Sequence, residues 1–260
     1  EALKDRRLTV LLLLMVGFWT MFNQLFYTLP NFIEDWVDSS ALSAWINEKS
    51  TFLGTILTSE GQVKAEWFIN IDSFMIIFFQ VLVSYFVTKM SHVSAMIRGT
   101  VIATLGVTLT FMFNNPWFTI IGTVIFSIGE MASSPTLSAF VAQITPKGKE
   151  ALYQGTVFLP VAAGNYLTGF FSGHLYTEWS DKYGLLKKEL AKRAIEMPEN
   201  LTKTQYFELA SQKLGLSQSQ ITQLLWDTYE PAKLWYVICA LGVFAAASLY
   251  IYNKQVTRSN

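Results

Sequence analysis

Long stretches of this 260-residue sequence carry almost no charge, and this pattern limits the chain to few folds. A helix needs about 20 mostly apolar residues to cross a lipid bilayer. Six runs that are long and apolar enough lie at 8–33, 67–88, 95–113, 117–144, 152–173 and 232–252. Six such runs exceed what the core of one soluble domain can cover, which disfavours the alternative of a soluble all-α protein. The sequence therefore predicts an all-α membrane protein with a bundle of six transmembrane helices.

The composition excludes several other classes of protein. Charged residues make up 15% of the chain, whereas a soluble domain usually carries about 25%. The formal net charge is +0 at pH 7, which gives no indication of nucleic-acid binding. The single cysteine, Cys239, cannot form an internal disulfide, and the sequence has neither a CxxC nor an HExxH motif. We expect no metal site, no cofactor and no catalytic residues, and hence no enzyme.

The distribution of basic residues predicts the orientation in the membrane. If the six runs alternate in direction, one side holds the cations Lys4, Arg6, Arg7, Lys89, Arg98, Lys147, Lys149, Lys254 and Arg258. Basic residues in short loops mark the cytoplasmic side. Both ends of the chain are therefore expected in the cytoplasm, with the protein spanning the cell (inner or plasma) membrane several times. The polar segments 34–66 and 178–231 then lie on the extracytoplasmic side.

These two polar segments differ in pattern. Segment 34–66 carries Trp36 and Trp45 at loosely helical spacing and is expected to lie along the outer membrane interface. Segment 178–231 is typical of about three short helices, with Pro198 separating the first two. Ser217 is a candidate N-cap for the last helix, which Pro231 ends. Such a segment either forms a solvated cap over the membrane domain or docks a partner.

Two acidic residues lie inside the predicted spans, Asp72 near the outer end of the second and Glu130 in the middle of the fourth. Charge is costly in hydrocarbon, so an ionisable residue there is a functional candidate. Ser134 follows Glu130 on the same helix face, and Pro135 leaves the carbonyl of Met131 without its helical donor. We expect Glu130 to face a water-filled path beside a hinge at Pro135. The alternative is a structural Glu130, paired with a buried cation or amide.

Two stripes of side chains could line such a path. Trp19, Asn23 and Tyr27 fall on one face of the first run. Aromatic stripes more often serve packing, but the amide of Asn23 at mid-span favours a cavity. Gln154 and Phe158 share a face of the fifth run. These residues are the predicted lining of a substrate site.

The stretch 129–173 resembles the tenth and eleventh helices of the proton-coupled oligopeptide transporter (POT/PTR) family, a branch of the major facilitator superfamily. "WFINIDSFMII" at 67–77 is similar to the eighth helix of that family, and "FWTMFNQ" at 18–24 is similar to the seventh. The order of the matches is preserved along the chain. Within 129–173, the similarity rests on Glu130, Ser134, Pro135, Leu137, Ser138, Pro146, Gly155, Asn165, Gly169 and Gly173.

The resemblance implies that residues 1–260 form one domain, the C-terminal six-helix bundle of a transporter that also has an N-terminal six-helix half. It implies proton-coupled transport, by symport and alternating access, of di- or tripeptides or similar amine-bearing small molecules. Glu130 would couple protons, and Glu130 and Asp72 would bind the substrate amine. The substrate site would also include Trp19, Asn23, Tyr27, Ser134, Gln154 and Phe158.

The sequence departs from the family pattern at three positions. Asp72 and Ser73 stand where the family has Asn-Pro, Asn23 stands where an acid is frequent, and Val157 stands where Trp is usual. These departures leave the substrate and the coupling open. The alternative function is a membrane-anchored interaction or receptor module that uses its extracytoplasmic segments and would not need Asp72 or Glu130.

Overall fold

The computed structural model describes residues 2–258, and nearly all of the regular structure in this range is helical. The only sheet in the described range is a short β-hairpin that pairs Thr58 with Val63. In chain order the elements are η1 (Ala2–Lys4), α1 (Arg6–Phe22), α2 (Gln24–Tyr27), α3 (Leu29–Trp36), α4 (Ser40–Lys49), α5 (Thr51–Leu57), β1 (Thr58–Ser59), β2 (Gln62–Val63), α6 (Ala65–Val87), α7 (His92–Met112), α8 (Pro116–Ile144), α9 (Glu150–Thr156), α10 (Phe158–Phe170), η2 (Phe171–Leu175), α11 (Tyr176–Trp179), α12 (Lys182–Lys192), α13 (Lys203–Leu214), α14 (Gln218–Tyr229), η3 (Pro231–Lys233) and α15 (Leu234–Arg258).

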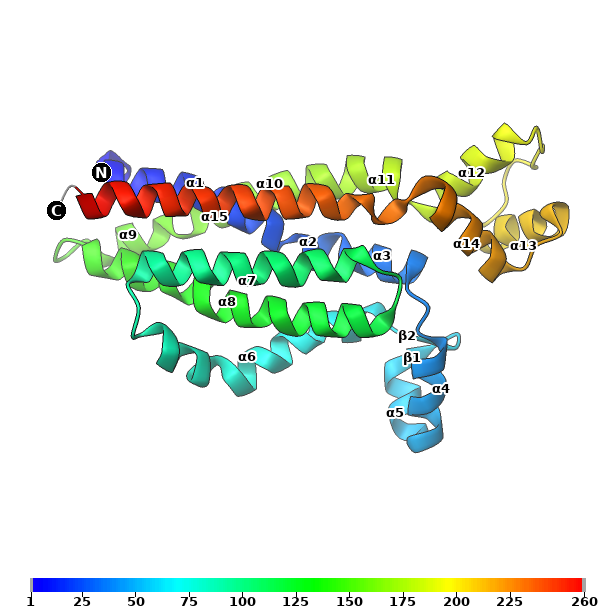
Figure 1. Ribbon diagram of the computed structural model, residues 1–260, viewed down its shortest axis with the longest axis horizontal. Helices are drawn as coiled ribbons and strands as arrows, with labels where there is room; N and C mark the ends of the chain where they lie inside the picture. The colour runs from blue at the N-terminus through cyan, green and yellow to red at the C-terminus, as the bar shows by residue number, and fades with distance from the viewer. Residues whose placement is uncertain (1, 259–260) are drawn as a thin grey trace.

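The long helices lie side by side, and the chain reverses direction between them (Figure 1). Helices α1 to α3 run away from the N-terminus, α6 runs back, and α7 and α8 repeat the reversal. The run from α9 to α11 leads away again, and α15 returns. Both ends of the described chain therefore lie at one end of the bundle, together with the loops before α7 and before α9. Helices α4, α5 and α12 to α14 lie at the other end, as the predicted alternation requires.

Five helical stretches are long and apolar enough to cross a membrane: Arg6–Trp36, Ala65–Val87, His92–Met112, Pro116–Ile144 and Pro231–Gln255. They agree with five of the six predicted runs. The remaining run, 152–173, is helical but is not one continuous helix. It is divided among α9, α10 and the π-helical turn η2.

The division between α9 and α10 has a local cause in the sequence. Pro160, in the first turn of α10, has no N–H to donate to the carbonyl four residues earlier, at Thr156. Val157, between the two helices, keeps helical dihedral angles, but its N–H donates to the carbonyl oxygen of Gln154, three residues back, at 3.1 Å. The run is apolar and helical, as the sequence predicts, but Pro160 divides it, and the prediction of one span does not include this division.

Small residues bring α7 and α8 into backbone contact. A Cβ atom placed on Gly106 would lie 2.2 Å from the backbone nitrogen of Phe126, and one on Gly129 would lie 2.2 Å from that of Ala103. Only glycine allows such an approach, and small residues serve the same purpose in membrane helices generally. We call this contact, formed by Gly99, Gly106, Gly122 and Gly129, the glycine seam.

The three helices predicted in segment 178–231 are present as α12, α13 and α14. Pro198 lies between the first two, and Ser217 caps α14 by accepting a hydrogen bond from the backbone N–H of Gln220. The segment is fixed to the end of α3, where the indole N–H of Trp36 donates to the carbonyl oxygen of Ser180 at 2.8 Å. The ring of Trp226 packs on that of Trp36, with 5.7 Å between centroids. These helices therefore form a cap on one end of the bundle.

Helices α4 and α5 form a separate hairpin that projects away from the bundle, across the direction of the long helices (Figure 1). Their packing leaves several large apolar side chains exposed, namely Trp45, Phe52, Leu53 and Ile56. The side chain of Lys64 and the indole of Trp67 both donate to the carbonyl oxygen of Ile56, which ties the hairpin to the start of α6.

Candidate functional site

The two intramembrane acids come from different helices and meet in the structure. Asp72 lies in α6 with only 2% of its surface exposed, and Glu130 lies half-buried in α8. Their carboxyl groups are close enough to interact with each other, and the hydroxyl of Ser127 lies near Asp72. An ionised carboxylate only accepts hydrogen bonds, so a bond between two carboxyl groups requires a proton on one of them. The pair is therefore a place where a proton can be held between two helices.

Several buried polar atoms of the predicted site have no hydrogen-bond partner within residues 2–258. They are Oδ1 of Asp72 and Oε2 of Glu130, which are acceptors when ionised, and Nδ2 of Asn23 and Nε1 of Trp19, which are donors. Buried polar groups are nearly always hydrogen-bonded, and an exception calls for a functional or solvent explanation. These four atoms give the region both acceptors and donors for a polar ligand.

Pro135 lies inside α8, which continues unbroken on both sides of it. The carbonyl of Met131, which has no helical donor because of this proline, accepts a hydrogen bond from the side-chain amide of Gln80 at 3.3 Å. The same Gln80 nitrogen lies 3.0 Å from the hydroxyl oxygen of Ser84. Helix α6 thus supplies the donor that the proline removes from α8.

Sequence reasoning identified the free carbonyl of Met131 but not its partner. The available signal was Gln80 itself, the one amide side chain in the mostly apolar second half of α6. Gln80 and Asp72 both contact α8, and they do so at Met131 and Glu130, which are adjacent in the chain. The proline and the acid of α8 are therefore both engaged by α6.

The stripe predicted on the first run is only partly directed into the bundle. Asn23 is buried where α1 ends and α2 begins. The ring of Trp19 packs on that of Phe22, with 4.8 Å between centroids. Phe22 in turn packs on Phe126 of α8, one helical turn before Glu130, with ring centroids 5.1 Å apart. The end of α1 therefore borders the acidic pair.

The other predicted site residues lie further toward the surface. Tyr27 is 49% exposed and Phe158 is 71% exposed. Gln154 donates to the carbonyl oxygen of Ser138 at 3.0 Å, which ties α9 to α8. Ser134 is half-buried one turn after Glu130. Within the described residues, no three His, Cys, Asp or Glu side chains come together as a metal site would need.

A bundle of long apolar helices with two acidic residues in its spans defines a multi-pass membrane protein. The sequence profile of the Major Facilitator Superfamily matches residues 39–185, which is more than half of the chain, so the chain belongs to this superfamily. The matched range includes Asp72, Glu130 and Pro135 but does not reach Trp19, Asn23 and Tyr27.

Among curated proteins, the chain is similar to the uncharacterized MFS-type transporter YttB of Bacillus subtilis (strain 168). The two are 28% identical over 147 residues, which cover 56% of this chain and 36% of that protein. The match thus spans little more than a third of the relative's length. No solved structure matches the chain.

Proposed function

We propose that this chain forms the C-terminal half of a proton-coupled secondary active transporter that works by alternating access. The proposed substrates are di- or tripeptides or similar amine-bearing small molecules. Membership of the major facilitator superfamily supports transport as the activity. The proposed partner is an N-terminal six-helix half of the same transporter, which would face the polar residues of this bundle.

The contact between Asp72 and Glu130 carries this proposal. With one proton between them, the two carboxyl groups hydrogen-bond and hold α6 against α8. Without that proton, two negative charges would face each other where water is scarce, and they would repel. The ammonium group of a substrate can replace the proton, because it donates charge-assisted hydrogen bonds to carboxylates. Proton binding, substrate binding and the spacing of two helices would then be linked at one site.

The hinge at Pro135 would turn this local change into helix movement. Glu130 and Met131 of α8 are both contacted by α6, and the proline follows within about one turn. A helix can bend at a proline because one hydrogen bond is absent there. In our proposal, separation of the acidic pair releases α6 and lets α8 bend at Pro135. The route of the substrate would be lined by Trp19, Asn23, Tyr27, Ser134, Gln154 and Phe158.

The proposed location is the cell membrane, with both ends of this chain in the cytoplasm. Both ends of the described chain, the loop with Lys89 and the loop with Lys147 lie at one end of the bundle (Figure 1). The positive-inside rule assigns that end to the cytoplasm. Cysteines introduced at Ser39 and Ser211 should then react with an impermeant label from outside, and cysteines at Ser91 and Gly148 should not.

Uptake into proteoliposomes that contain the full-length protein tests the proposal. Glu130→Gln keeps the shape of the side chain but cannot ionise. We expect proton-driven uptake of a dipeptide to fall by at least about tenfold, equivalent to about 1.4 kcal/mol. Glu66→Gln is the matched control, since Glu66 is an exposed acid at the start of α6, and it should transport normally.

Two outcomes would contradict parts of this function. Normal uptake by Glu130→Gln with an unchanged pH profile would exclude this carboxyl group as the coupling residue. The amine-bearing class is tested separately, by comparing a dipeptide with its N-acetylated form. Equal uptake of the two would show that Asp72 and Glu130 do not bind an ammonium group.

A further inference from the structure

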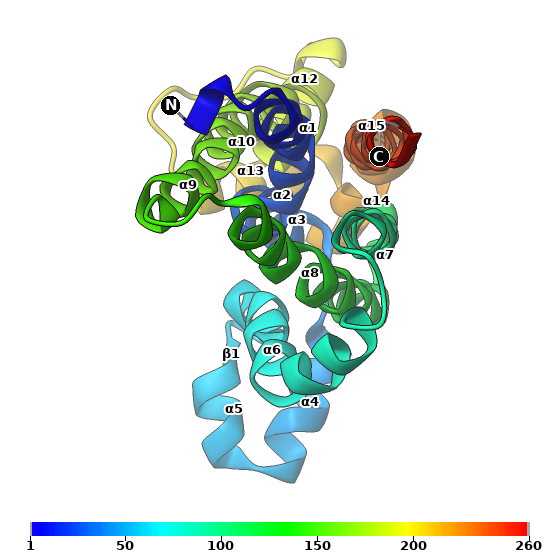
Figure 2. The same cartoon turned by 90° about the vertical axis from the view of Figure 1, so that its left-hand side faces the viewer.

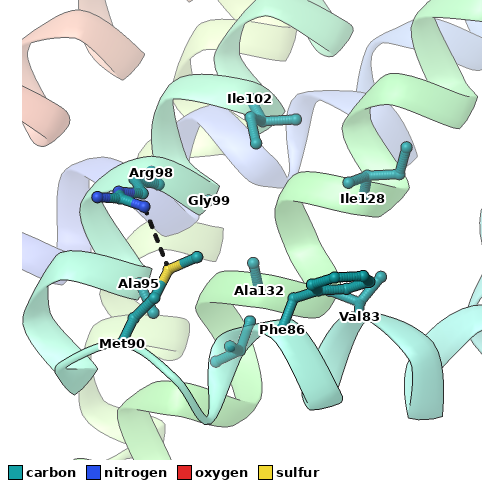
Figure 3. A pocket seen from close by; sticks show the side chains of 10 residues that line it. Val83, Phe86, Met90, Ala95, Arg98, Gly99, Ile102, Ile128 and Ala132 are labelled. Atoms are coloured by element: carbon teal, nitrogen blue, oxygen red, sulfur yellow. Dashed lines mark hydrogen bonds between the residues drawn. The ribbon is translucent and has the colours of Figure 1, made fainter.

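A pocket of about 200 Å³ lies between α6, α7 and α8, apart from the acidic pair. Figure 3 shows Phe86 of α6 in front of Ala132 of α8, with Arg98 of α7 next to Met90. The walls are apolar apart from Arg98. The pocket lies toward the end of α6 and the start of α7, which is the end of the bundle where the described chain begins and ends.

The pocket exists because α6 diverges from a tightly packed pair of helices. Gly99 brings α7 so close to α8 that an added Cβ would lie 2.7 Å from the carbonyl oxygen of Gly129. Gly99, Ala95 and Ala132 therefore form a floor without large side chains, and Val83 and Phe86 of α6 form the opposite wall. Phe86 is exposed, as are most large apolar side chains of α6. In a membrane protein such an apolar surface faces lipid or another part of the membrane domain.

The size of the pocket restricts what it can hold. Sites for whole drug-sized molecules usually measure about 300–1,000 Å³. A pocket of about 200 Å³ is better suited to a segment of a longer apolar molecule. An acyl chain, part of which stays in the surrounding bilayer, has this character.

Arg98 adds a positive charge at the pocket. Its guanidinium Nη1 lies 3.6 Å from the sulfur of Met90, and within residues 2–258 no acidic side chain pairs with it. The sequence contains no acidic residue between Asp72 and Glu130, so no carboxylate is available nearby in the chain. Lys89 precedes the lining residue Met90 in the chain and lies over the ring of Tyr85 at 4.0 Å, so it is a second cation at this end of α6. Basic residues between membrane helices on the cytoplasmic side are typical of sites for anionic lipid headgroups.

We propose that this pocket binds one anionic phospholipid, with an acyl chain between α6 and α7 and the phosphate at Arg98 and Lys89. An acyl chain matches the apolar walls, and the negative headgroup matches the two cations. A zwitterionic lipid such as phosphatidylcholine has the same phosphate but no net negative charge, because its choline group is positive, so its headgroup should bind the two cations less strongly. Free phosphate would lack the acyl chain. The bound chain would fill the space left by α6 and support its position. This site does not depend on the transport activity proposed above.

Native mass spectrometry of the full-length protein, with dioleoyl phosphatidylglycerol or dioleoyl phosphatidylcholine added, tests the site. We expect one phosphatidylglycerol to be retained more strongly than phosphatidylcholine. Arg98→Gln should lower this preference about fivefold, because one cation near an anionic surface contributes about 1 kcal/mol. Arg7→Gln is the matched control, since Arg7 is exposed at the same end of the bundle but outside the pocket. It should retain the wild-type preference.

Filling the pocket tests the acyl chain separately. Ala132→Leu and Ile102→Phe extend the pocket wall from α8 and from α7, and either should reduce retention of phosphatidylglycerol. Two variants are used so that one misfolded protein does not decide the result. Equal retention of the two lipids by the wild-type protein, or equal effects of Arg98→Gln and Arg7→Gln, would overturn the proposal. Displacement of the lipid by inorganic phosphate alone would overturn the role of the acyl chain.

Discussion

Helix α8 contacts its two neighbours, α7 and α6, in different ways. Against α7 it packs backbone to backbone along the glycine seam. Against α6 its polar contacts are those of Asp72 with Glu130 and of Gln80 with the carbonyl of Met131. Of the most apolar stretch of α6, 11% is buried inside the chain, compared with 61% for α7. Figure 2, viewed along the bundle, shows α7 on one side of α8 and α6 on another, toward α4 and α5.

This difference indicates which helix can move. Opening the glycine seam would remove many close contacts at once. Membrane helices are held together mainly by such packing contacts, because the surrounding lipid provides no hydrophobic driving force for their association. Separating α6 breaks a few polar contacts, each worth about 0.5–1.5 kcal/mol. We therefore expect α7 and the part of α8 before Pro135, which carries the glycine seam, to move as one unit and α6 to change position relative to them. The following substitutions test the two contacts.

The largest effect is expected from a substitution in the glycine seam. Gly129→Leu places a side chain where even a Cβ would lie 2.2 Å from the backbone nitrogen of Ala103. The two helices must then separate. Overpacking typically costs about 1–3 kcal/mol, and we expect the upper end of this range because the backbone itself must move. The free energy of unfolding of the full-length protein, measured by steric trapping in bilayers, should fall by that amount.

Gly169→Ala is the matched control for this prediction. Gly169 also lies in a helix, but a Cβ added there meets nothing within 4 Å in the described chain. Replacing glycine by alanine in a helix should leave stability unchanged or raise it by about 0.4–1 kcal/mol. If Gly129→Leu proved as stable as Gly169→Ala, the seam would not be the rigid contact described above.

A smaller effect is expected on the α6 side. Gln80→Leu removes the donor to the carbonyl oxygen of Met131, which the proline leaves without a helical partner. A buried acceptor without a partner costs about 1–3 kcal/mol, so α6 should separate from α8 more readily. A cysteine at Ile76, which lies one turn from both Asp72 and Gln80 on the same face of α6, reports this separation. In a Cys239→Ser background, we expect this cysteine to react faster with a membrane-permeant thiol reagent when Gln80→Leu is present.

Ser84→Ala distinguishes between the two hydrogen-bond partners of Gln80, the hydroxyl of Ser84 and the carbonyl of Met131. It removes the neighbouring hydroxyl, which lies 3.0 Å from the Gln80 amide, but leaves the contact with Met131 intact. This variant should behave like the wild-type protein in the cysteine-reactivity measurement. Equal effects of Gln80→Leu and Ser84→Ala would mean that the contact with α8 is not the reason for the change.

The sequence was sufficient for those features that depend on neighbouring residues alone. Apolar length predicted five of the spanning helices, and the cap at Ser217 and the position of Pro198 predicted the helices of segment 178–231. The free carbonyl of Met131 followed from Pro135 by the geometry of one helix. In each case the cause and the effect lie within a few positions of each other.

Features that depend on the pairing of helices could not be read in the same way. The partner of Met131 is Gln80, and the partner of Glu130 is Asp72. Both partners lie in α6, which is separated from α8 in the chain by the whole of α7. Their contact depends on how α6 crosses α8, which hydropathy does not describe. The exposure of Tyr27 and Phe158 likewise depends on the packing of whole helices. A stripe of side chains in the sequence identifies one face of a helix but not the helix that packs against that face.

Pro135 and the side-chain amide of Gln80 should be energetically coupled, by about 1 kcal/mol in the free energy of unfolding. Pro135→Ala restores a backbone N–H that can bond to the carbonyl of Met131, so Gln80 is no longer needed as its donor. Gln80→Leu should then cost less in the Pro135→Ala background, by about the value of one hydrogen bond. A double-mutant cycle on the free energy of unfolding measures this coupling. Additive effects would show that the amide does not compensate for the proline.

The smallest effect on stability is expected for Asp72→Asn, which makes the α6–α8 contact independent of a proton. The side-chain amide introduced by this substitution can donate a hydrogen bond to Glu130 whether or not that carboxyl group is ionised. The free energy of unfolding should change by less than about 1 kcal/mol, and transport should persist with a weaker preference for cationic substrates. In the wild-type protein, by contrast, basic buffer should remove the shared proton and separate the two helices.

Spin labels on α6 and α8 can detect this difference. Labels at Thr88→Cys and Gln143→Cys, in a Cys239→Ser background, report the distance between the ends of the two helices, and both positions are exposed. In the wild-type background we expect the distance distribution to shift toward longer values from acidic to basic buffer, because two adjacent carboxylates repel. With Asp72→Asn the shift should disappear, whereas the control Glu66→Gln should keep it. A shift that persists in Asp72→Asn would mean that another group controls the position of α6, and the proton held between α6 and α8 would then have no part in their separation.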